Sequence, residues 1–281
     1  MLRFISASNI YSNAMAEQLD LRALCQSCLK IAEVAGDKIL EIYQGEFDVQ
    51  SKKDNTPLTA ADLAAHNYIT DALSALTPEL PILSEEAADI PYSTRKKWQT
   101  YWLVDPLDGT REFIKRNGEF SVNIALIHQH KSVLGVINIP VQKISYFASN
   151  GSGAFKLKGS HDLIPIQCRQ ANPDELLIAG SRSHRSDRLK EFLSQLGNPH
   201  VIPMGSSIKS CMVAEGSVDL YPRLGLTSEW DTAAAHCIVE EAGGQITQTD
   251  MQPLLYNTKE SLLNPEFFVF GKTDINWSEY L

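Results

Sequence analysis

Hydrophobic residues recur at helical spacing in the first quarter of the chain. Apolar positions three and four residues apart predict a helix from about residue 21 to Gly45, where a glycine is a typical stop signal. The same spacing predicts a second helix from near Thr59 to about Leu76, after a polar stretch at residues 50–57. The N-terminal region therefore reads as two helices, the second with a well-defined apolar face.

The middle of the chain changes to short apolar runs separated by turn residues. These runs predict strands at residues 81–84, 101–104, 121–127, 133–139 and 144–148. The last three are expected to form an antiparallel meander. Farther on, strands and helices alternate, with strands predicted at 176–180, 218–221 and 267–270 and helices at 185–196, 205–215 and 231–243. Helices first, then a sheet, then alternating elements predict α+β layers.

The same pattern gives an expectation for the domain organisation. Residues 1–14 do not match the helical pattern of the adjoining segment and are interpreted as a leader or an artificial extension, with Met15 as an alternative start. A length of 281 residues and a hydrophobic content of 43% suffice for one sizeable core or for two closely packed halves. No strong linker is visible, and Pro165 is the best candidate for a boundary. We therefore expect an N-terminal α+β half at 15–165 and a C-terminal α/β half at 166–281.

Charge and cysteine content narrow the functional classes. Lys and Arg total 25 against 34 Asp and Glu, and this acidic balance without a basic stripe argues against nucleic-acid binding. Among five cysteines, Cys25 and Cys28 form a Cys-x-x-Cys pair inside a helical pattern, and we interpret them as buried thiols. The odd count favours a reducing cytoplasm. No apolar run approaches the roughly 18 residues that a membrane span needs, so contact with the inner membrane would be peripheral.

The segment Asp105-Pro-Leu-Asp-Gly-Thr-Arg-Glu112 carries the strongest chemical signal. It follows an apolar run that should deliver Asp105 to a turn, which Pro106 and Gly109 are expected to force. Two carboxylates three residues apart and a threonine hydroxyl would then converge. Such a group repels itself unless a hard divalent cation binds its oxygens. Sites of this kind most often serve phosphate chemistry in water.

Three further segments place carboxylates at the boundaries of predicted elements. Thr59-Ala-Ala-Asp62 also fits a helix capping box. Asp231 also fits a helix N-cap, and Glu85-Glu86 could simply be solvated. Taken singly, each segment is better explained by structure than by function, so only their combination with the Asp105 segment indicates a site.

The combination resembles a known family. The segments Trp102-Leu-Val-Asp-Pro-Leu-Asp-Gly-Thr110 and Glu229-Trp-Asp-Thr-Ala-Ala234, and the spacing between them, resemble the two signatures of the inositol monophosphatase superfamily. That superfamily comprises magnesium-dependent, lithium-sensitive phosphomonoesterases. The resemblance implies a layered αβαβα sugar-phosphatase-like fold. An antiparallel sheet would lie in the N-terminal half and a second, mixed sheet in the C-terminal half.

The resemblance can be narrowed to the bacterial 3'(2'),5'-bisphosphate nucleotidases, and it extends from about Leu21 to Phe270. Six further segments carry it: Asn55-Thr-Pro-Leu-Thr-Ala-Ala-Asp62, Ile82-Leu-Ser-Glu-Glu86, Lys115-Arg-Asn-Gly-Glu-Phe120, Ser181-Arg-Ser-His184, Gly205-Ser-Ser-Ile-Lys209 and Leu220-Tyr-Pro-Arg223. The implied activity is hydrolysis of adenosine 3',5'-bisphosphate to AMP and phosphate, which would clear a by-product of sulfate assimilation.

The resemblance also implies roles for individual residues, with two or three Mg²⁺ ions as the cofactor. One ion would be held by Glu85, Asp105, the Leu107 carbonyl and Thr110, a second by Asp105, Asp108 and Asp231, and a third near Glu85. Thr110 and Asp62 would orient and deprotonate the attacking water. Substrate contacts are implied at Glu85, Leu107, Asp108, Gly109, Thr110, Ser181, His184, Gly205, Lys209, Arg223 and Asp231.

Two other functions stay open at this point. One is an inositol or sugar phosphatase on the same scaffold, and the other is a catalytically silent module that binds magnesium or calcium. Lys209 and Arg223 favour a substrate with a second anionic group, as does the expected helix start at Gly205-Ser-Ser207, whose N–H groups could hold an anion. We expect a small-molecule nucleotide as partner, with no nucleic acid and no integral membrane segment. Homodimers occur in the superfamily, so the oligomeric state is left open.

Overall fold

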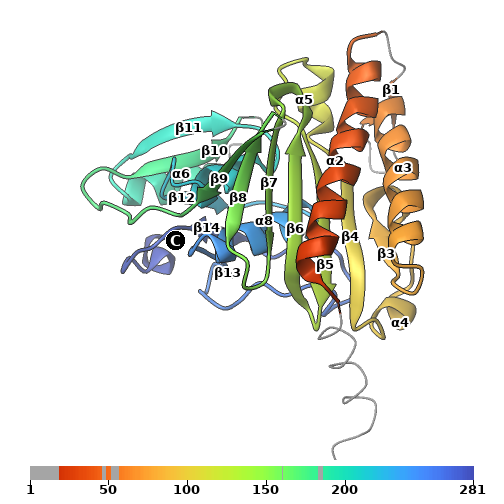
Figure 1. Ribbon diagram of the computed structural model, residues 1–281. Coiled ribbons are helices and arrows are strands. Elements are labelled where there is room, and N and C mark those ends of the chain that lie inside the picture. The colour runs from red at the N-terminus through yellow and green to blue at the C-terminus, as the bar shows by residue number, and fades with distance from the viewer. Residues whose placement is uncertain (1–18, 46–48, 52–56, 160, 183–185) are drawn as a thin grey trace, which may run out of the picture.

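The computed structural model describes residues 19–45, 49–51, 57–159, 161–182 and 186–281 (Figure 1). Helices and sheets alternate as layers in the order helix, sheet, helix, sheet, helix. Helices α2 (Leu21–Tyr43) and α3 (Ala60–Leu76) cover one face of the first sheet, and α8 (Glu229–Glu241) covers its other face. The predicted α+β layering is confirmed.

The first sheet contains seven strands in sequence order, from β3 to β9. β3 runs parallel to β4, and every other pair of neighbours is antiparallel, as the predicted meander requires. The strands are β3 (Ile82–Ser84), β4 (Thr100–Asp108), β5 (Ser121–His128), β6 (Lys131–Ile139), β7 (Ile144–Ser149), β8 (Ala154–Lys158) and β9 (Asp162–Ile166). A separate antiparallel pair is formed by β1 (Val49–Ser51) and β2 (Pro57–Thr59).

The middle of β5 is apolar because helices bury both faces of the sheet there. On β5, Ile124 and Leu126 pack in the core beneath α2 and α3, whereas Ala125 and Ile127 belong to the core that includes α8. Successive side chains of a strand point to opposite faces, so a doubly covered strand needs apolar residues at every position.

The second sheet is mixed, in the order β11-β10-β12-β14-β13. β10 is parallel to both of its neighbours, whereas β14 is antiparallel to β12 and β13. Its strands are β10 (Leu177–Ser181), β11 (His200–Met204), β12 (Leu220–Arg223), β13 (Gln245–Gln248) and β14 (Phe267–Phe270). The expected mixed sheet in the C-terminal half is therefore confirmed.

Two more helices complete the layers. α7 (Ile208–Ala214) packs beside α8 between the two sheets. α6 (Asp187–Gln195) covers the outer face of the second sheet, where Phe192 stacks on Phe268. The shorter helices are η1 (Glu85–Ala87), α4 (Tyr92–Arg95), α5 (Thr110–Ile114), η2 (Pro140–Gln142) and η3 (Trp277–Tyr280).

α8 approaches the first sheet most closely where β6 carries Gly135. A Cβ atom at Gly135 would lie only 2.1 Å from the carbonyl oxygen of Ala234, so the absence of a side chain permits this contact. Small residues of α8, Ala233 and Ala235, are buried on either side. This contact brings the N-terminal end of α8 to the first sheet.

The division into halves at residue 165 stays a prediction. Pro165 lies inside β9, and α8 of the C-terminal half packs on the sheet of the N-terminal half. Residues 1–14 lie outside the described part of the chain. Within the described ranges, every helix is too short or too polar to cross a bilayer.

Candidate active site

β4 is longer than predicted and carries both aspartates of the first signature. It continues through Asp108, and its pairing with β5 becomes irregular after Asp105. Asp105 lies opposite Asn123 and Asp108 opposite Ser121, so three residue steps on β4 face two on β5. An extra residue in a β-bulge turns side chains that would otherwise point to opposite faces toward the same face. The expected turn at Pro106 is therefore wrong, and a bulge brings the two carboxylates together.

The chain turns away from the sheet at Gly109, as the position of this glycine suggested. Its φ of +95° is one that side-chain-bearing residues rarely adopt, and a Cβ there would lie 3.1 Å from the Glu119 carbonyl oxygen. α5 begins directly afterwards at Thr110. The Thr110 hydroxyl donates a hydrogen bond to the Leu107 carbonyl at 3.4 Å. The turn thus places together the two oxygen atoms that the resemblance assigns to one metal ion.

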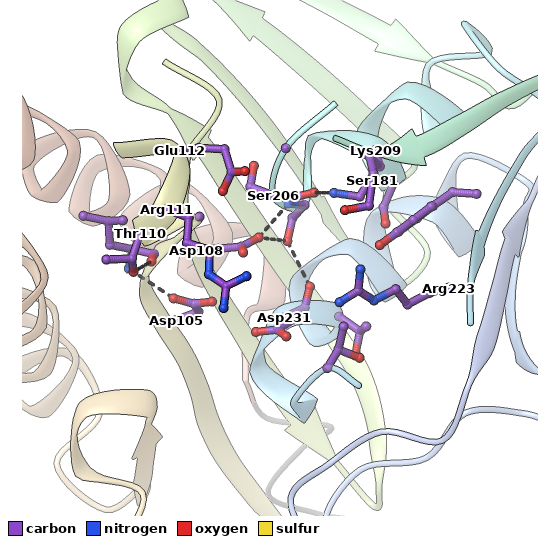
Figure 2. A pocket seen from close by; sticks show the side chains of 18 of the residues that line it. Asp105, Asp108, Thr110, Arg111, Glu112, Ser181, Ser206, Lys209, Arg223 and Asp231 are labelled. Atoms are coloured by element: carbon purple, nitrogen blue, oxygen red, sulfur yellow. Dashed lines mark hydrogen bonds between the residues drawn. The ribbon is translucent and has the colours of Figure 1, made fainter. Parts of the chain in front are cut away.

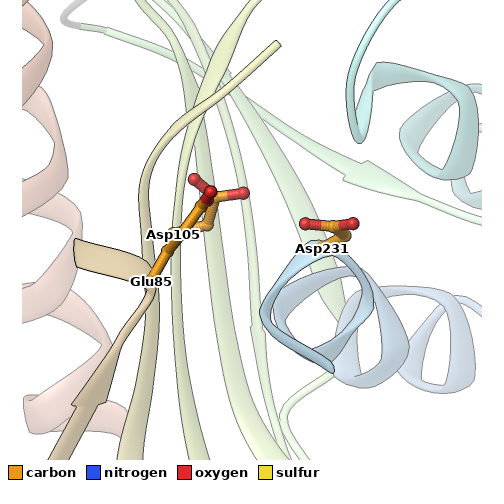
Figure 3. Close-up of side chains that lie close together, drawn as sticks. All are labelled: Glu85, Asp105 and Asp231. Atoms are coloured by element: carbon orange, nitrogen blue, oxygen red, sulfur yellow. The ribbon is translucent and has the colours of Figure 1, made fainter. Parts of the chain in front are cut away.

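Three carboxylates from separate elements converge near this turn (Figure 3). Oxygen atoms of Glu85, Asp105 and Asp231 all lie within 4.8 Å of one another. Glu85 follows β3, which runs parallel to β4, and Asp231 lies in the first turn of α8. Burial, reinforced by the neighbouring charges, raises the pKa of Asp105 well above its ordinary value. Burial and the charges of Asp108 and Glu85 likewise raise the pKa of Asp231 to about 8.

Among the described residues, Asp105 and Asp231 each accept hydrogen bonds through only one carboxylate oxygen. The Leu107 N–H donates to Asp105 Oδ1 at 3.1 Å, and the Ser228 N–H donates to Asp231 Oδ2 at 2.9 Å. Asp105 Oδ2 is buried and accepts no hydrogen bond from any described residue. A buried carboxylate oxygen without a donor is destabilising. A divalent cation would neutralise it, so these residues suit a metal site with oxygen ligands.

Asp108 lies beside this group, and it is held more firmly. Its Oδ2 atom accepts hydrogen bonds from the backbone N–H and the hydroxyl of Ser207, each at 2.6 Å. Asn123 approaches the same oxygen at 3.5 Å. The charge of Asp108 also contributes to the raised pKa values of Asp105 and Asp231, so the carboxyl groups are close enough to repel one another.

These residues line a cavity of about 270 Å³ (Figure 2). Most of the residues expected at the site line it: Glu85, Asp105, Leu107, Asp108, Gly109, Thr110, Ser181, Gly205, Lys209, Arg223 and Asp231. Asp62 does not line it, but this residue is buried at the start of α3 and its charge also raises the pKa of Asp105. His184 and Asn55 lie outside the described residues.

The opposite side of the cavity is cationic. Figure 2 shows Lys209 and Arg223 across the cavity from Asp105 and Thr110. Lys209 is buried, and its ammonium group donates to the Ser206 carbonyl at 2.5 Å. Burial lowers the pKa of Lys209 to about 8. The cavity therefore combines carboxylates with buried or half-buried cations, which suits a ligand with two anionic groups once a metal ion is bound by the carboxylates.

The anion site expected at residues 205–207 stays a prediction, although two of its three backbone donors already have partners. The Gly205 N–H donates to Glu119 Oε2 at 2.8 Å, and the Ser207 N–H is taken by Asp108. α7 begins only at Ile208, so Gly205 precedes the helix. These backbone donors bind carboxylates of the protein instead of a ligand.

Sequence reasoning also missed several residues that line the cavity. Arg111 and Glu112 belong to the segment that carried the strongest signal, and Tyr221 belongs to a segment that carried the resemblance. Position within these segments was the available signal for all three. Ser207 had the same signal, because it lies in the Gly205-Ser-Ser-Ile-Lys209 segment.

Comparison with known proteins places this site in a family. The sequence model of the inositol monophosphatase family matches residues 20–272 of this chain. The chain belongs to the inositol monophosphatase family. Within this family, the chain is 50% identical over 249 residues to the 3'(2'),5'-bisphosphate nucleotidase CysQ of Escherichia coli strain K12, covering 88% of this chain and 98% of that protein. It is 40% identical to the protein of the same name from Haemophilus influenzae strain Rd over 90% of this chain and 95% of that protein.

Solved structures of the family agree. The crystal structure of CysQ from Bacteroides thetaiotaomicron has a TM-score of 0.79 and 43% identity, covering 89% of this chain and 97% of that one. An inositol monophosphatase from Anabaena shares the fold, with a TM-score of 0.75 and 23% identity over 93% of this chain and 96% of that one. Both support the layered fold described above.

Proposed function

We propose that the protein is a metal-dependent phosphomonoesterase that hydrolyses adenosine 3',5'-bisphosphate to AMP and phosphate, as a 3'(2'),5'-bisphosphate nucleotidase. The observation that carries the proposal is one cavity lined both by the acidic group of Glu85, Asp105 and Asp231 and by Lys209 and Arg223. The 50% identity to a nucleotidase supports it further. An inositol phosphatase is less well supported, because the inositol monophosphatase from Anabaena is only 23% identical.

The proposed cofactor is Mg²⁺, with two or three ions bound. The groups that would hold it are Glu85, Asp105, the Leu107 carbonyl, Asp108, Thr110 and Asp231. When bound, the cations would lower the pKa of the attacking water and offset the negative charge that grows on the phosphoryl oxygens. The buried Asp105 Oδ2, which accepts no hydrogen bond within the described ranges, supports this assignment.

The chain itself would supply positioning and proton transfer. Thr110 and Asp62 are proposed to orient and deprotonate the attacking water, the carboxylate as the final acceptor because a hydroxyl is a weak base. Lys209 and Arg223 are proposed to bind the phosphate that is not cleaved. Ser181 and Gly205 line the cavity, and His184 is proposed to contact the nucleotide with them. Most of the rate enhancement would then come from positioning and electrostatics.

The test is phosphate release from a panel of phosphomonoesters with and without Mg²⁺. We expect adenosine 3',5'-bisphosphate to be cleaved faster than inositol 1-phosphate, and only with the metal. Asp105→Asn should lose nearly all turnover while keeping its fold by circular dichroism, because it removes a proposed metal ligand. Asp162→Asn, at an exposed aspartate of β9, is the matched control and should behave as wild type. Faster cleavage of inositol 1-phosphate, or an active Asp105→Asn variant, would contradict the proposal.

The family resemblance adds two further proposals. Millimolar LiCl should inhibit the same reaction, with NaCl at equal ionic strength as the control. The reaction would serve sulfur assimilation in the cytoplasm by removing a by-product. Whether the protein is a homodimer is a separate question that sedimentation of the purified protein answers.

A further inference from the structure

Ser207 joins two of the aspartates at the site. It is 4% exposed and lies directly before α7. Its hydroxyl oxygen is 2.6 Å from Asp108 Oδ2 and 2.9 Å from the carbonyl oxygen of Asp231, and it accepts a hydrogen bond from the Asn123 amide at 2.9 Å. Dashed lines in Figure 2 mark the contacts that reach Asp108 and Asp231. A single side chain therefore contacts residues of β4, β5 and α8.

The hydrogen-bonding capacity of a serine fits this arrangement. A hydroxyl donates one proton and accepts through two lone pairs. Ser207 can donate to Asp108 or to the Asp231 carbonyl while it accepts from Asn123. The backbone N–H of Ser207 also donates to Asp108 Oδ2, so this oxygen remains bonded in either case. Asn123 in turn lies opposite Asp105 in the pairing of β4 with β5.

Electrostatic repulsion explains why such a connection is needed. Asp108 lies close enough to Asp105 and Asp231 for their like charges to interact, and like charges held together repel when no cation is bound. Asp108 lies on the first sheet and Asp231 on α8, far apart in the sequence. Their separation is therefore set by tertiary contacts and not by a short connecting segment. Charge-assisted hydrogen bonds to one oxygen of Asp108 oppose the repulsion and leave Oδ1 with a fixed direction.

We propose that Ser207, supported by Asn123, is a positioning residue that keeps Asp108 and the start of α8 at the separation a shared metal site requires. The inference rests on the proposed function, because it assumes that these carboxylates bind a cation. Residues that hydrogen-bond to metal ligands orient them, and their loss typically weakens metal binding about 10–100-fold.

The test is Mn²⁺ binding by metal-stripped protein, followed through the electron paramagnetic resonance signal of free Mn²⁺. Ser207→Ala should bind Mn²⁺ at least about 10-fold more weakly than wild type. Ser207→Thr keeps the hydroxyl and should recover most of the affinity. In turnover assays, the Mg²⁺ concentration for half-maximal rate should rise for Ser207→Ala, while KM for the nucleotide at saturating Mg²⁺ changes little.

Ser145→Ala is the matched control. Ser145 is also buried and accepts from an asparagine amide, Asn138 Nδ2, at 3.0 Å, but it lies away from the cavity on β7. Both alanine variants remove a buried hydroxyl of the same kind, so a purely structural role of Ser207 would give both the same Mn²⁺ affinity. We expect Ser145→Ala to bind Mn²⁺ as wild type does.

The outcomes separate the two proposals. If wild-type protein neither binds Mn²⁺ nor hydrolyses the nucleotide, the proposed function is wrong. If wild type does both and Ser207→Ala keeps wild-type Mn²⁺ affinity, only the positioning role is overturned. Should Ser207→Ala fail to fold, Asn123→Ala removes the donor to the same hydroxyl and must also weaken Mn²⁺ binding. Unchanged affinity in that variant would overturn the positioning role.

Discussion

Gly135→Ala tests whether the contact of α8 with the first sheet sets the position of Asp231. The added Cβ would lie 2.1 Å from the Ala234 carbonyl oxygen and 2.9 Å from its carbon. Carbon and oxygen atoms in close contact are normally about 3.3 Å apart. α8 must therefore retreat from β6 by about 1 Å to relieve the overlap. Ala234 is three residues after Asp231 in the same helix, so a retreat at one shifts the other.

The size of the effect can be worked out from this displacement. Inserting a methyl group into a well-packed core typically costs about 1–3 kcal/mol. For a chain of this size, each kcal/mol lowers the melting temperature by about 2–4 °C. A displacement of about 1 Å among reacting groups can reduce activity by roughly 10²-fold. We therefore expect a modest loss of stability and a much larger loss of kcat/KM in protein that is still folded.

Thermal unfolding and kcat/KM for adenosine 3',5'-bisphosphate are the two measurements. Gly45→Ala is the control, because its Cβ would meet only the Ile42 carbonyl oxygen at an ordinary 3.7 Å. If Gly135→Ala melted with the control and kept wild-type kcat/KM, the close approach of α8 would not determine the position of Asp231. A loss of kcat/KM no larger than the unfolded fraction would refute the displacement argument as well.

Three further predictions concern ionisable groups. Burial and nearby charges raise the pKa of Asp231 from 3.8 to about 8. The metal-free wild type should therefore lose stability relative to Asp231→Asn as the pH rises from about 4 to about 8, and added Mg²⁺ should reverse this loss. A relative stability that rises over this pH range would contradict the prediction. Burial lowers the pKa of Lys209 from 10.5 to about 8, so KM for the bisphosphate should rise above this pH in wild type but not in Lys209→Met. Burial raises the pKa of Cys25 and of Cys168 to about 12. An aromatic disulfide that reacts with thiolates should therefore label these thiols quickly in unfolded protein and slowly in native protein.

The sequence predicted the strands that are almost entirely buried and missed β8, β9, β11 and β13. β5, β6 and β14 are almost entirely buried, so their apolar runs were visible. β9 and β11 are edge strands of their sheets, and their residues are largely exposed or half-buried. An edge strand is held mainly by backbone hydrogen bonds to one neighbour, which leave no apolar periodicity in the sequence. β9 and β11 therefore lack the hydrophobic pattern that would have indicated a strand.

For the site, motifs predicted the residue types but not how they meet. Asp105 and Asp108 were expected to converge at a turn, but the bulge that aligns them depends on the register between β4 and β5. Register is a property of two paired strands, so neither segment alone contains it. The contacts of Ser207 were even harder to predict from its segment. Its hydroxyl contacts Asp108, about a hundred positions away, and Asp231, about two dozen positions away.

Asp231 shows why a structural and a functional explanation of one residue need not compete. From the sequence, a role at the helix start and a role as a metal ligand were alternatives. In the structure, Oδ2 accepts the Ser228 N–H in the capping box of α8, and among the described residues Oδ1 accepts no hydrogen bond. Asp105 divides its oxygens in the same way, with Oδ1 bonded to the Leu107 N–H. A carboxylate fixed through one oxygen directs the other without help from a cation, so the proposed ligands are arranged before any metal binds.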